Sequence, residues 1–331
     1  MNDRVVALCG GIGGAKLALG LVHVIDPERL SIIVNTGDDF EHLGLNISPD
    51  LDTVVYTLSG LADRERGWGR ADETWQFMQA LGELGGPSWF HLGDRDMAMH
   101  VERTRALRSG VTLSSFVARA ARTLGIRARI LPMTDDPVQT VVETEDDRLA
   151  FQQYFVERRC APVVHTLHFA GADRAVPAPG VLEALSAPSL RAVVICPSNP
   201  YLSIDPILAI AGIRAGLMNA AAPVVAISPI IGGHAIKGPT VKIMSELGIA
   251  ATTASIAAHY QDLLDGLVID EADADDAASL DVPAYATRTL MNDLPDRIRL
   301  AKETLAFADT LSTGGRELAG QAIATERRRP S

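Results

Sequence analysis

Residues 9–16 ("CGGIGGAK") hold four glycines in five positions, between an apolar run and the start of a helical pattern. Glycines in such a loop let backbone N–H groups approach an anion at a helix N-terminus, where the helix dipole carries about half a positive charge. Lys16 stands where the dinucleotide fingerprint needs its third glycine, and no hydroxyl follows that lysine as a P-loop requires. We predict that the loop holds a phosphate or a group beside one, and a tight strand-to-helix turn is the alternative. Its glycines are Gly10, Gly11, Gly13 and Gly14.

Four aspartates lie within 15 positions of one another, Asp38 and Asp39 in "NTGDD" and Asp50 and Asp52 in "SPDLDT". Carboxylates beside an anion-binding loop suggest a divalent cation, and Mg²⁺ needs only one or two of them because substrate oxygens and water complete its shell. The second stretch also has the pattern of a helix start, with Ser48 as the N-cap and acids in the first turn. Both interpretations stay open at this point.

The stretch "GDRD" places Arg95 between Asp94 and Asp96. An arginine between two acids is either part of a structural ion pair or a fork that binds a phosphate or carbonyl oxygen. His234 is a further site candidate, and Lys237 is expected to add positive charge to a transferring group. Two other loops offer donors and room for close backbone approach, through Ser198 and Asn199 in "PSNP" and Ser228, Gly232 and Gly233 in "SPIIGG".

Short apolar runs precede most of these loops, and helical patterns separate them. Runs without polar alternation, interleaved with helices, predict strands of a parallel sheet that is covered on both faces. The fold class is therefore α/β, with a doubly wound, mostly parallel, Rossmann-like sheet. In such a sheet the loops after the strands lie at one edge, so we expect them to converge on one cleft. The predicted strands are residues 5–9, 31–35, 192–196, 223–227 and 267–270.

Residues 131–185 break the pattern, because two strand-like runs flank a helix there. We predict an inserted, smaller α/β cap subdomain at 131–185, within a nucleotide-binding core made of 1–130 and 186–331. The predicted helices of the core are residues 72–84, 97–108, 112–124, 205–218 and 296–308.

The composition is that of a globular protein, with 331 residues and a net charge of −11. A strongly acidic chain is a poor partner for nucleic acid, whose binding depends on summed phosphate neutralisation by Lys and Arg. No leader pattern and no apolar run of membrane-spanning length is found, so we expect a cytoplasmic protein without a membrane partner. The three cysteines are too few and too scattered for a disulfide framework or a four-ligand zinc site, and we expect free thiols.

Several stretches occur together in the order of one family: "GGIGGAKLALGL", "VNTGDD", "SPDLDTVVYTLSG", "RGWG", "HLGDRD", "LPMTDDPVQT", "SNPYLSIDPIL", "SPIIGG" and "GPT". Taken together, they resemble the CofD/FbiA family, the 2-phospho-L-lactate or phosphoenolpyruvyl transferases of coenzyme F-420 biosynthesis. The resemblance runs from about residue 5 to residue 308, and the glycine loop alone would not carry it. It implies a homodimer.

The resemblance implies a Mg²⁺-assisted transfer. A guanosine diphosphate-linked donor gives up a phospholactyl, phosphoenolpyruvyl or phosphoglyceryl group to the ribityl hydroxyl of the deazaflavin Fo, and GMP is released. The implied catalytic residues are Asp50, Asp52 and Arg95, and the implied metal ligands are Asp39, Asp50 and Asp52. The implied substrate-binding residues are Gly10, Gly11, Gly13, Gly14, Asp39, Asp50, Trp68, Asp94, Arg95, Ser198, Asn199, Ser228, Gly232 and Gly233.

Two other functions compete with this one. Distant relatives of the gluconeogenesis-factor type share the glycine loop and the "SNP" region, which would suit a nucleotide-sugar-binding regulator. An NAD-dependent dehydrogenase is suggested by the glycine loop alone, and Lys16 weighs against it.

Trp68 is a core or surface aromatic unless a planar ligand stacks on it.

Overall fold

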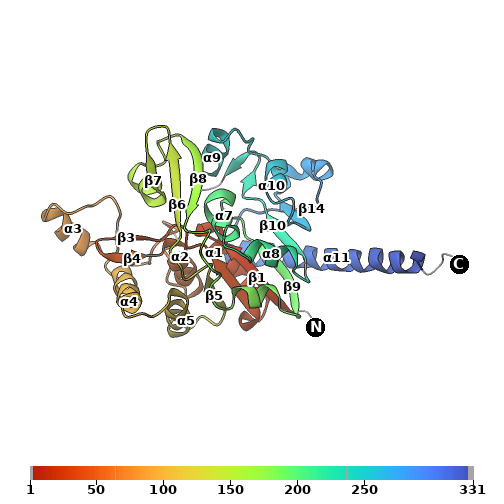
Figure 1. Cartoon of the computed structure of the whole chain (residues 1–331), viewed down its shortest axis with the longest axis horizontal. Coiled ribbons are helices and arrows are strands. Elements are labelled where there is room, and N and C mark those ends of the chain that lie inside the picture. The colour runs from red at the N-terminus through yellow and green to blue at the C-terminus, as the bar shows by residue number, and fades with distance from the viewer. Residues whose placement is uncertain (1–2, 64, 236–237, 327–331) are drawn as a thin grey trace.

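The computed structural model describes residues 3–63, 65–235 and 238–326. A seven-stranded sheet forms its centre, in the order β14-β13-β10-β9-β1-β2-β5, and every pairing in it is parallel (Figure 1). The predicted doubly wound, parallel sheet is therefore confirmed. Its strands are β1 (Arg4–Cys9), β2 (Leu30–Val34), β5 (Arg129–Pro132), β9 (Leu190–Ile195), β10 (Val224–Ile227), β13 (Gly266–Ile269) and β14 (Ala284–Ala286).

Strand β1 shows why these runs carry no polar alternation. Val5, Ala7 and Cys9 pack into the core on one face of the sheet, whereas Val6 and Leu8 pack into the core on the other. Because both faces are covered, successive residues are all buried. The chain's three cysteines are free, as expected.

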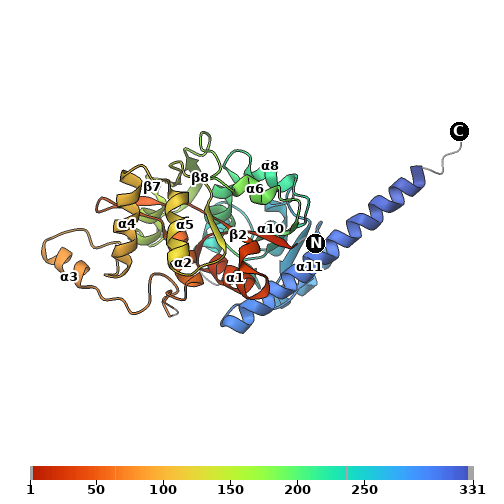
Figure 2. The same cartoon turned by 90° about the horizontal axis from the view of Figure 1, so that it is seen from below.

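Helices cover one face of the sheet (Figure 2). The glycine loop leads directly from β1 into the first of them, and the last of them packs along that helix at Gly20, close to the backbone of Arg297. The helices on this face are α1 (Gly11–Val24), α2 (Pro49–Leu58), α5 (Leu113–Thr123) and α11 (Leu294–Glu326). Thr112 caps α5 through its side chain, which accepts a hydrogen bond from the amide of Ser115.

The opposite face carries shorter helices and a second sheet. The helices are α6 (Val181–Leu185), α7 (Asp205–Leu208), α8 (Ile213–Met218), α9 (Thr240–Glu246) and α10 (Thr253–His259), with the π-helix η3 (Pro200–Ile204) before α7. A predicted single helix over 205–218 is wrong, because the chain breaks between α7 and α8, where Gly212 takes φ +90°.

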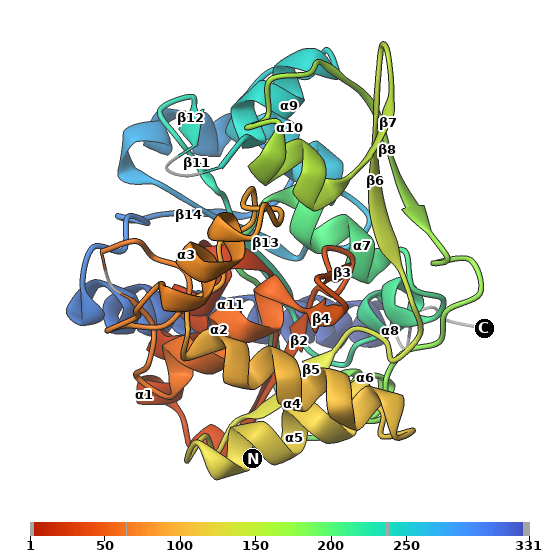
Figure 3. The same cartoon turned by 90° about the vertical axis from the view of Figure 1, so that its left-hand side faces the viewer.

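The segment 131–185 contains a three-stranded antiparallel sheet that projects from the body of the protein (Figure 1 and Figure 3). Its strands are β6 (Gln139–Thr144), β7 (Arg148–Ala150) and β8 (Val164–Ala170), and the π-helix η2 (Gln153–Glu157) lies between the last two. Val142 and Val164 share one apolar core with Leu8 of the central sheet. The first two residues of this segment belong to β5 of the central sheet. That residues 131–185 form a separate inserted subdomain stays a prediction.

A third, small core forms around Ile47, Met78 and Leu92, at the side of the molecule away from β14. It joins the hairpin of β3 (Phe40–His42) and β4 (Leu45–Ile47) to α3 (Gln76–Glu83) and α4 (Asp96–Arg108). The remaining elements are η1 (Pro27–Arg29), β11 (Ile230–Ile231), β12 (His234–Ala235) and η4 (Glu271–Ser279).

Helix α11 extends well past the predicted 296–308 and projects from the body of the protein (Figure 2). Length alone does not make it a membrane span. Within the described part of the chain, no helix combines the length and the apolar character needed to cross a bilayer.

The contact between α1 and α11 gives a stability test. A Cβ at Gly20 would overlap the backbone carbonyl of Arg297, and backbone cannot swing aside. We expect Gly20→Ala to lower the free energy of unfolding by about 1–3 kcal/mol in urea denaturation, because the helices must separate.

Gly82→Ala is the matched control, since Gly82 lies in α3 with no neighbour within 4 Å of the added Cβ. It should leave stability unchanged or raise it by up to about 1 kcal/mol through helix propensity. Equal effects at both positions would contradict the packing argument.

Candidate active site

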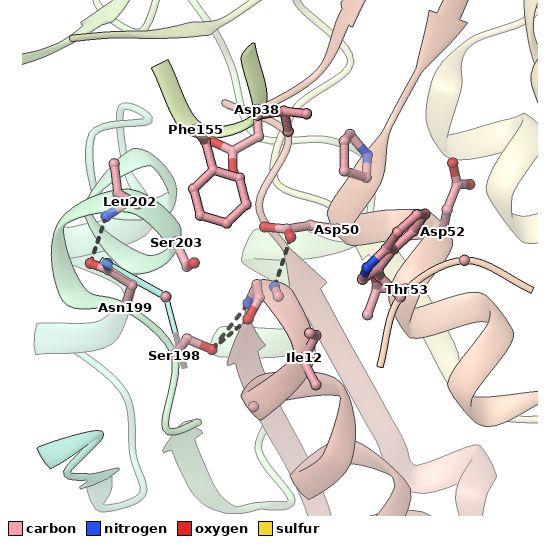
Figure 4. A pocket seen from close by; sticks show the side chains of 18 of the residues that line it. Ile12, Asp38, Asp50, Asp52, Thr53, Phe155, Ser198, Asn199, Leu202 and Ser203 are labelled. Atoms are coloured by element: carbon pink, nitrogen blue, oxygen red, sulfur yellow. Dashed lines mark hydrogen bonds between the residues drawn. The ribbon is translucent and has the colours of Figure 1, made fainter. Parts of the chain in front are cut away.

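The turns after β1 and β9 meet at the point where the strand order reverses. From these two central neighbours, the chain continues outward to β2 and β5 on one side and to β10, β13 and β14 on the other. The amide of Gly10 donates to Oγ of Ser198 at 3.2 Å, and that hydroxyl donates to the carbonyl of Gly10 at 2.8 Å (Figure 4). In open parallel sheets, ligands bind at such a switch point.

A cavity of about 940 Å³ opens there. Turns that follow β1, β2, β9 and β10 line it, together with the start of α2, so the predicted convergence of these loops on one cleft is confirmed. The volume suits a ligand at the large end of the usual range for small-molecule sites. The predicted site residues that line it are Gly10, Gly11, Gly13, Asp50, Asp52, Trp68, Ser198, Asn199 and Ser228.

The other predicted residues lie elsewhere, as far as the described lining shows. Asp94 accepts the first amides of α3 from Gln76 and Phe77, and Arg95 is largely exposed, 4.0 Å from Asp72. Their predicted ligand roles stay predictions. The predicted residues outside the described lining are Gly14, Asp39, Asp94, Arg95, Gly232 and Gly233.

The loop after β10 uses one of its glycine amides within the protein. The amide of Gly232 donates to the carboxylate of Asp273 at 3.0 Å, so that donor is already used. The exposed His234 contacts the carbonyl of Gly232 through Nδ1 at 2.7 Å. Lys237 lies outside the described residues.

The glycine turn is shaped by its close neighbours within the protein. Gly11 takes φ +63°, a conformation that L side chains rarely adopt. A Cβ at Gly13 would overlap the carbonyl of Pro197, and one at Gly10 would lie 2.5 Å from Oδ2 of Asp50. The glycines are thus needed for the approach of β9 and α2, whatever ligand the turn holds.

Asp50 lies at the N-terminus of helix α1. Its Oδ1 accepts a hydrogen bond from the amide of Gly11 at 2.7 Å (Figure 4). Its Oδ2 accepts a hydrogen bond from Nδ2 of Asn35 at 3.0 Å. Burial raises the pKa of Asp50 to about 6, although both hydrogen bonds oppose the shift. This carboxylate therefore occupies the first amide of the predicted anion site.

Asp38 lines the cavity, although the family resemblance implies its neighbour Asp39 as the metal ligand. The buried Oδ1 of Asp38 has no hydrogen-bond partner among the described residues. Burial, followed by the nearby charge of Asp50, raises the pKa of Asp38 well above its usual value. Oδ2 of Asp39 accepts a hydrogen bond from the hydroxyl of Ser48 at 2.6 Å, and its buried Oδ1 likewise has no partner among the described residues. Ser48 is the N-cap of α2, as predicted, but its side chain makes no capping hydrogen bond.

Asp52 points away from Asp50, because residues two apart in a helix do not share a face (Figure 4). Its two oxygens accept both terminal nitrogens of Arg103, at 2.6–3.0 Å, and Arg103 is only 1% exposed. Burial raises the pKa of Asp52 to about 6 even though Arg103 lowers it. The two aspartates therefore cannot ligate the same ion in this arrangement.

Aromatic side chains form the wall of the cavity near α2 and α4. The guanidinium of Arg66 lies 5.3 Å from the ring centre of Trp68 and 5.0 Å from that of Trp75, and Asp63 anchors its Nε at 2.9 Å. Phe155 of η2 adds an aromatic face from the small sheet. The cavity therefore joins the glycine turn to a wall that carries aromatic side chains. The wall also includes Tyr56, Trp89, Phe90, His91 and Phe151.

Comparison with known proteins agrees with this geometry. A family model described as 2-phospho-L-lactate transferase CofD matches residues 5–305. The chain belongs to the CofD family. It is a transferase by that membership, and the match covers every strand of the central sheet.

Curated CofD-family relatives are similar over nearly their whole length. A phosphoenolpyruvate transferase of Kitasatospora aureofaciens is 42% identical over 94% of this chain and 99% of its own length. Its namesake in Streptomyces coelicolor is 41% identical over 92% of this chain and 98% of its own.

A solved structure shares the fold. A member of the UPF0052 family from Bacillus halodurans superposes with a TM-score of 0.61, over 92% of this chain and 99% of its own, at 15% identity. That likeness supports the α/β architecture and carries no conclusion about substrate.

The pair of Asp52 and Arg103 gives a second stability test. Arg103→Met leaves the Asp52 carboxylate buried without its cation, and we expect the free energy of unfolding to fall by about 3–5 kcal/mol in urea denaturation.

Arg105→Met is the control on the same helix, because Arg105 is exposed and pairs with the exposed Glu102. It should change stability little, since solvent screens such pairs. A mild effect at Arg103 would show that the buried pair is not needed for folding.

Proposed function

We propose that this CofD-family chain transfers a phosphoenolpyruvyl or 2-phospholactyl-type group from a guanosine diphosphate-linked donor to the ribityl hydroxyl of the deazaflavin Fo, releasing GMP, in coenzyme F-420 biosynthesis. The observation that carries the proposal is a single cavity that joins the glycine turn to an aromatic wall. Such a cavity suits a transfer between a nucleotide and a planar ring, because both ligands fit beside one reaction centre. The names of the curated relatives support the three-carbon acid.

The donor's diphosphate is assigned to the glycine turn. The amides of Ile12 and Gly13 follow in the first turn of α1, where amides have no partner within the helix. Nδ2 of Asn199 is buried without a described acceptor, while its Oδ1 caps η3 by accepting the amides of Tyr201 and Leu202. These donors suit phosphate oxygens.

The acceptor's ring system is assigned to the aromatic wall. Trp68 is 45% exposed beside the cavity, so a planar ligand can cover it at little cost in reorganisation. The ribityl chain would then extend toward the glycine turn. This order of ligands brings the hydroxyl to the donor phosphorus.

Magnesium fits the chain at Asp38 and Asp50. The unpartnered Oδ1 of Asp38 and the repulsion between these two buried carboxylates are what a divalent cation would relieve. This choice keeps the expected Asp50 but replaces Asp39, which does not line the described cavity, and Asp52, which points away from Asp50. When bound, Mg²⁺ would offset charge on the phosphoryl oxygens.

The remaining chemistry is positioning. The acceptor oxygen forms a bond to phosphorus while the bond from phosphorus to the GMP oxygen breaks, and GMP leaves with that electron pair. The hydroxyl proton passes to a carboxylate of the cavity. Amides fixed at the helix N-terminus hold the phosphoryl oxygens without reorganising during the step.

The regulator hypothesis makes a different prediction about the aromatic end. A nucleotide-sugar-binding regulator needs the glycine turn but has no use for a deazaflavin, so Fo fluorescence should not respond to it. The transferase should quench or shift Fo fluorescence on binding. The dehydrogenase hypothesis fails if titration with NADH gives no binding signal.

The decisive experiment offers Fo, Mg²⁺ and each guanosine diphosphate-linked donor in turn, and identifies the product by mass. We expect the enolpyruvyl donor to yield phosphoenolpyruvyl-Fo together with GMP, in line with the curated relatives. Formation of no adduct with the enolpyruvyl, lactyl or glyceryl donor would contradict the proposed function.

Two substitutions test the carboxylate pair. We expect Asp50→Asn and Asp38→Asn each to lower kcat on the order of 100-fold, because charge placed at the transferring group is lost. The measurement is initial GMP release at saturating substrates.

The control is Asp146→Asn, at the exposed hairpin tip between β6 and β7, which should keep the full rate. Thermal melts establish that all three variants fold. Normal turnover in both test variants would reduce these carboxylates to a structural role.

A further inference from the structure

A second group of possible ligands lies at the aromatic end of the cavity. It consists of Asp52 from α2 and of Asp96 and His100, one turn apart on α4, and each offers a ligand atom within 4.8 Å of the others. All three line the cavity. Since Asp52 points away from Asp50, this group is separate from the pair of Asp38 and Asp50.

His100 is buried without a well-formed hydrogen bond. Its side chain is 2% exposed, and neither ring nitrogen makes a hydrogen bond within the described structure. Nε2 lies 3.4 Å from Oδ2 of Asp96, and Nδ1 lies 3.7 Å from Oδ2 of Asp52, distances too long for good hydrogen bonds. The two carboxylates are the ion-pair partners of the imidazole, at distances that leave its hydrogen bonds poorly formed, and an ion bound between the three groups would satisfy all of them.

Outer contacts hold both carboxylates in place. Arg103 donates hydrogen bonds to both oxygens of Asp52, and the hydroxyl of Tyr56 donates to Oδ1 of Asp96 at 2.5 Å. Oδ2 of each carboxylate faces His100, and Oδ2 of Asp52 also accepts hydrogen bonds from Arg103, at 2.7 and 3.0 Å. Partners of this kind orient the ligands of protein metal sites.

We propose that Asp52, Asp96 and His100 bind one divalent transition-metal ion, of the class of Mn²⁺, Fe²⁺, Co²⁺ or Zn²⁺. Two carboxylate oxygens and one imidazole nitrogen suit these ions better than Mg²⁺, which prefers oxygen alone. Arg103 and the divalent ion together carry three positive charges against two carboxylates, so the site has a net charge of +1 before a further ligand binds. Three protein ligands leave positions open toward the cavity, where a ligand oxygen or water completes the shell.

The site goes beyond the proposed transfer reaction and does not rest on it. Its test is binding of Co²⁺ to the full chain, after removal of metals with EDTA and exchange into chelator-free buffer, with no substrate present. Visible absorption reports the coordination of Co²⁺, and calorimetry reports stoichiometry. We expect a Co²⁺ absorption band that reaches its full strength when one Co²⁺ is bound at this site in each chain.

Variants of the chain show which residues give rise to that band. His100→Ala should weaken the binding at least 10-fold, and His23→Ala, an exposed histidine on α1, should bind as the unaltered chain does. Asp38→Asn should also keep the band, which separates this site from the proposed magnesium site. His100→Asn, which retains polar atoms, replaces His100→Ala if the latter fails to fold in a thermal melt.

Two results would overturn the proposal. One is that the unaltered chain shows no Co²⁺ band, or that both His100 variants keep it at full strength. The other is that NMR of the metal-free chain shows His100 as an imidazolium unaffected by Co²⁺, because a protonated ring between two carboxylates would balance the same charge. Neither result would bear on Fo or donor binding.

Discussion

The contact between Asp50 and the amide of Gly11 brings the site together. Through it the start of α2 lies against the start of α1, and Oδ2 of the same carboxylate accepts a hydrogen bond from Asn35, just after β2. Ser198 completes the junction from the other side of the switch point. Segments far apart in the sequence therefore meet within hydrogen-bond distance, and glycine is required because any side chain at Gly10 would displace them.

Much of the fold could be predicted from the sequence, because burial on both faces leaves a clear mark. A strand such as β1 must be apolar at every position, and the glycine loop that follows it identifies the edge where ligands bind. The helix over 205–218 could not be predicted correctly, since apolar spacing continues across Gly212 while the backbone does not. The spacing of apolar residues predicts that a helix forms, but it does not predict the tertiary contacts that end the helix.

The site was harder to predict than the fold. Asp50 was found because it starts a helix beside a glycine loop, but nothing in "NTGDD" separates Asp38 from Asp39, whose side chains find different surroundings only in three dimensions. The group around His100 was missed for the same reason. Its side chains come from two helices, and their orientation depends on contacts with Arg103 and Tyr56, whose positions no spacing rule gives.

Helix α11 has a consequence for how the protein is made. The glycine helix α1 leaves the ribosome well before α11 is made, yet Gly20 of α1 packs against Arg297 of α11. An incomplete nascent chain therefore lacks the surface against which α1 is held. The glycine-turn end of the cavity reaches its final form only after α11 has been made, so a product truncated before α11 would lack a well-formed glycine turn.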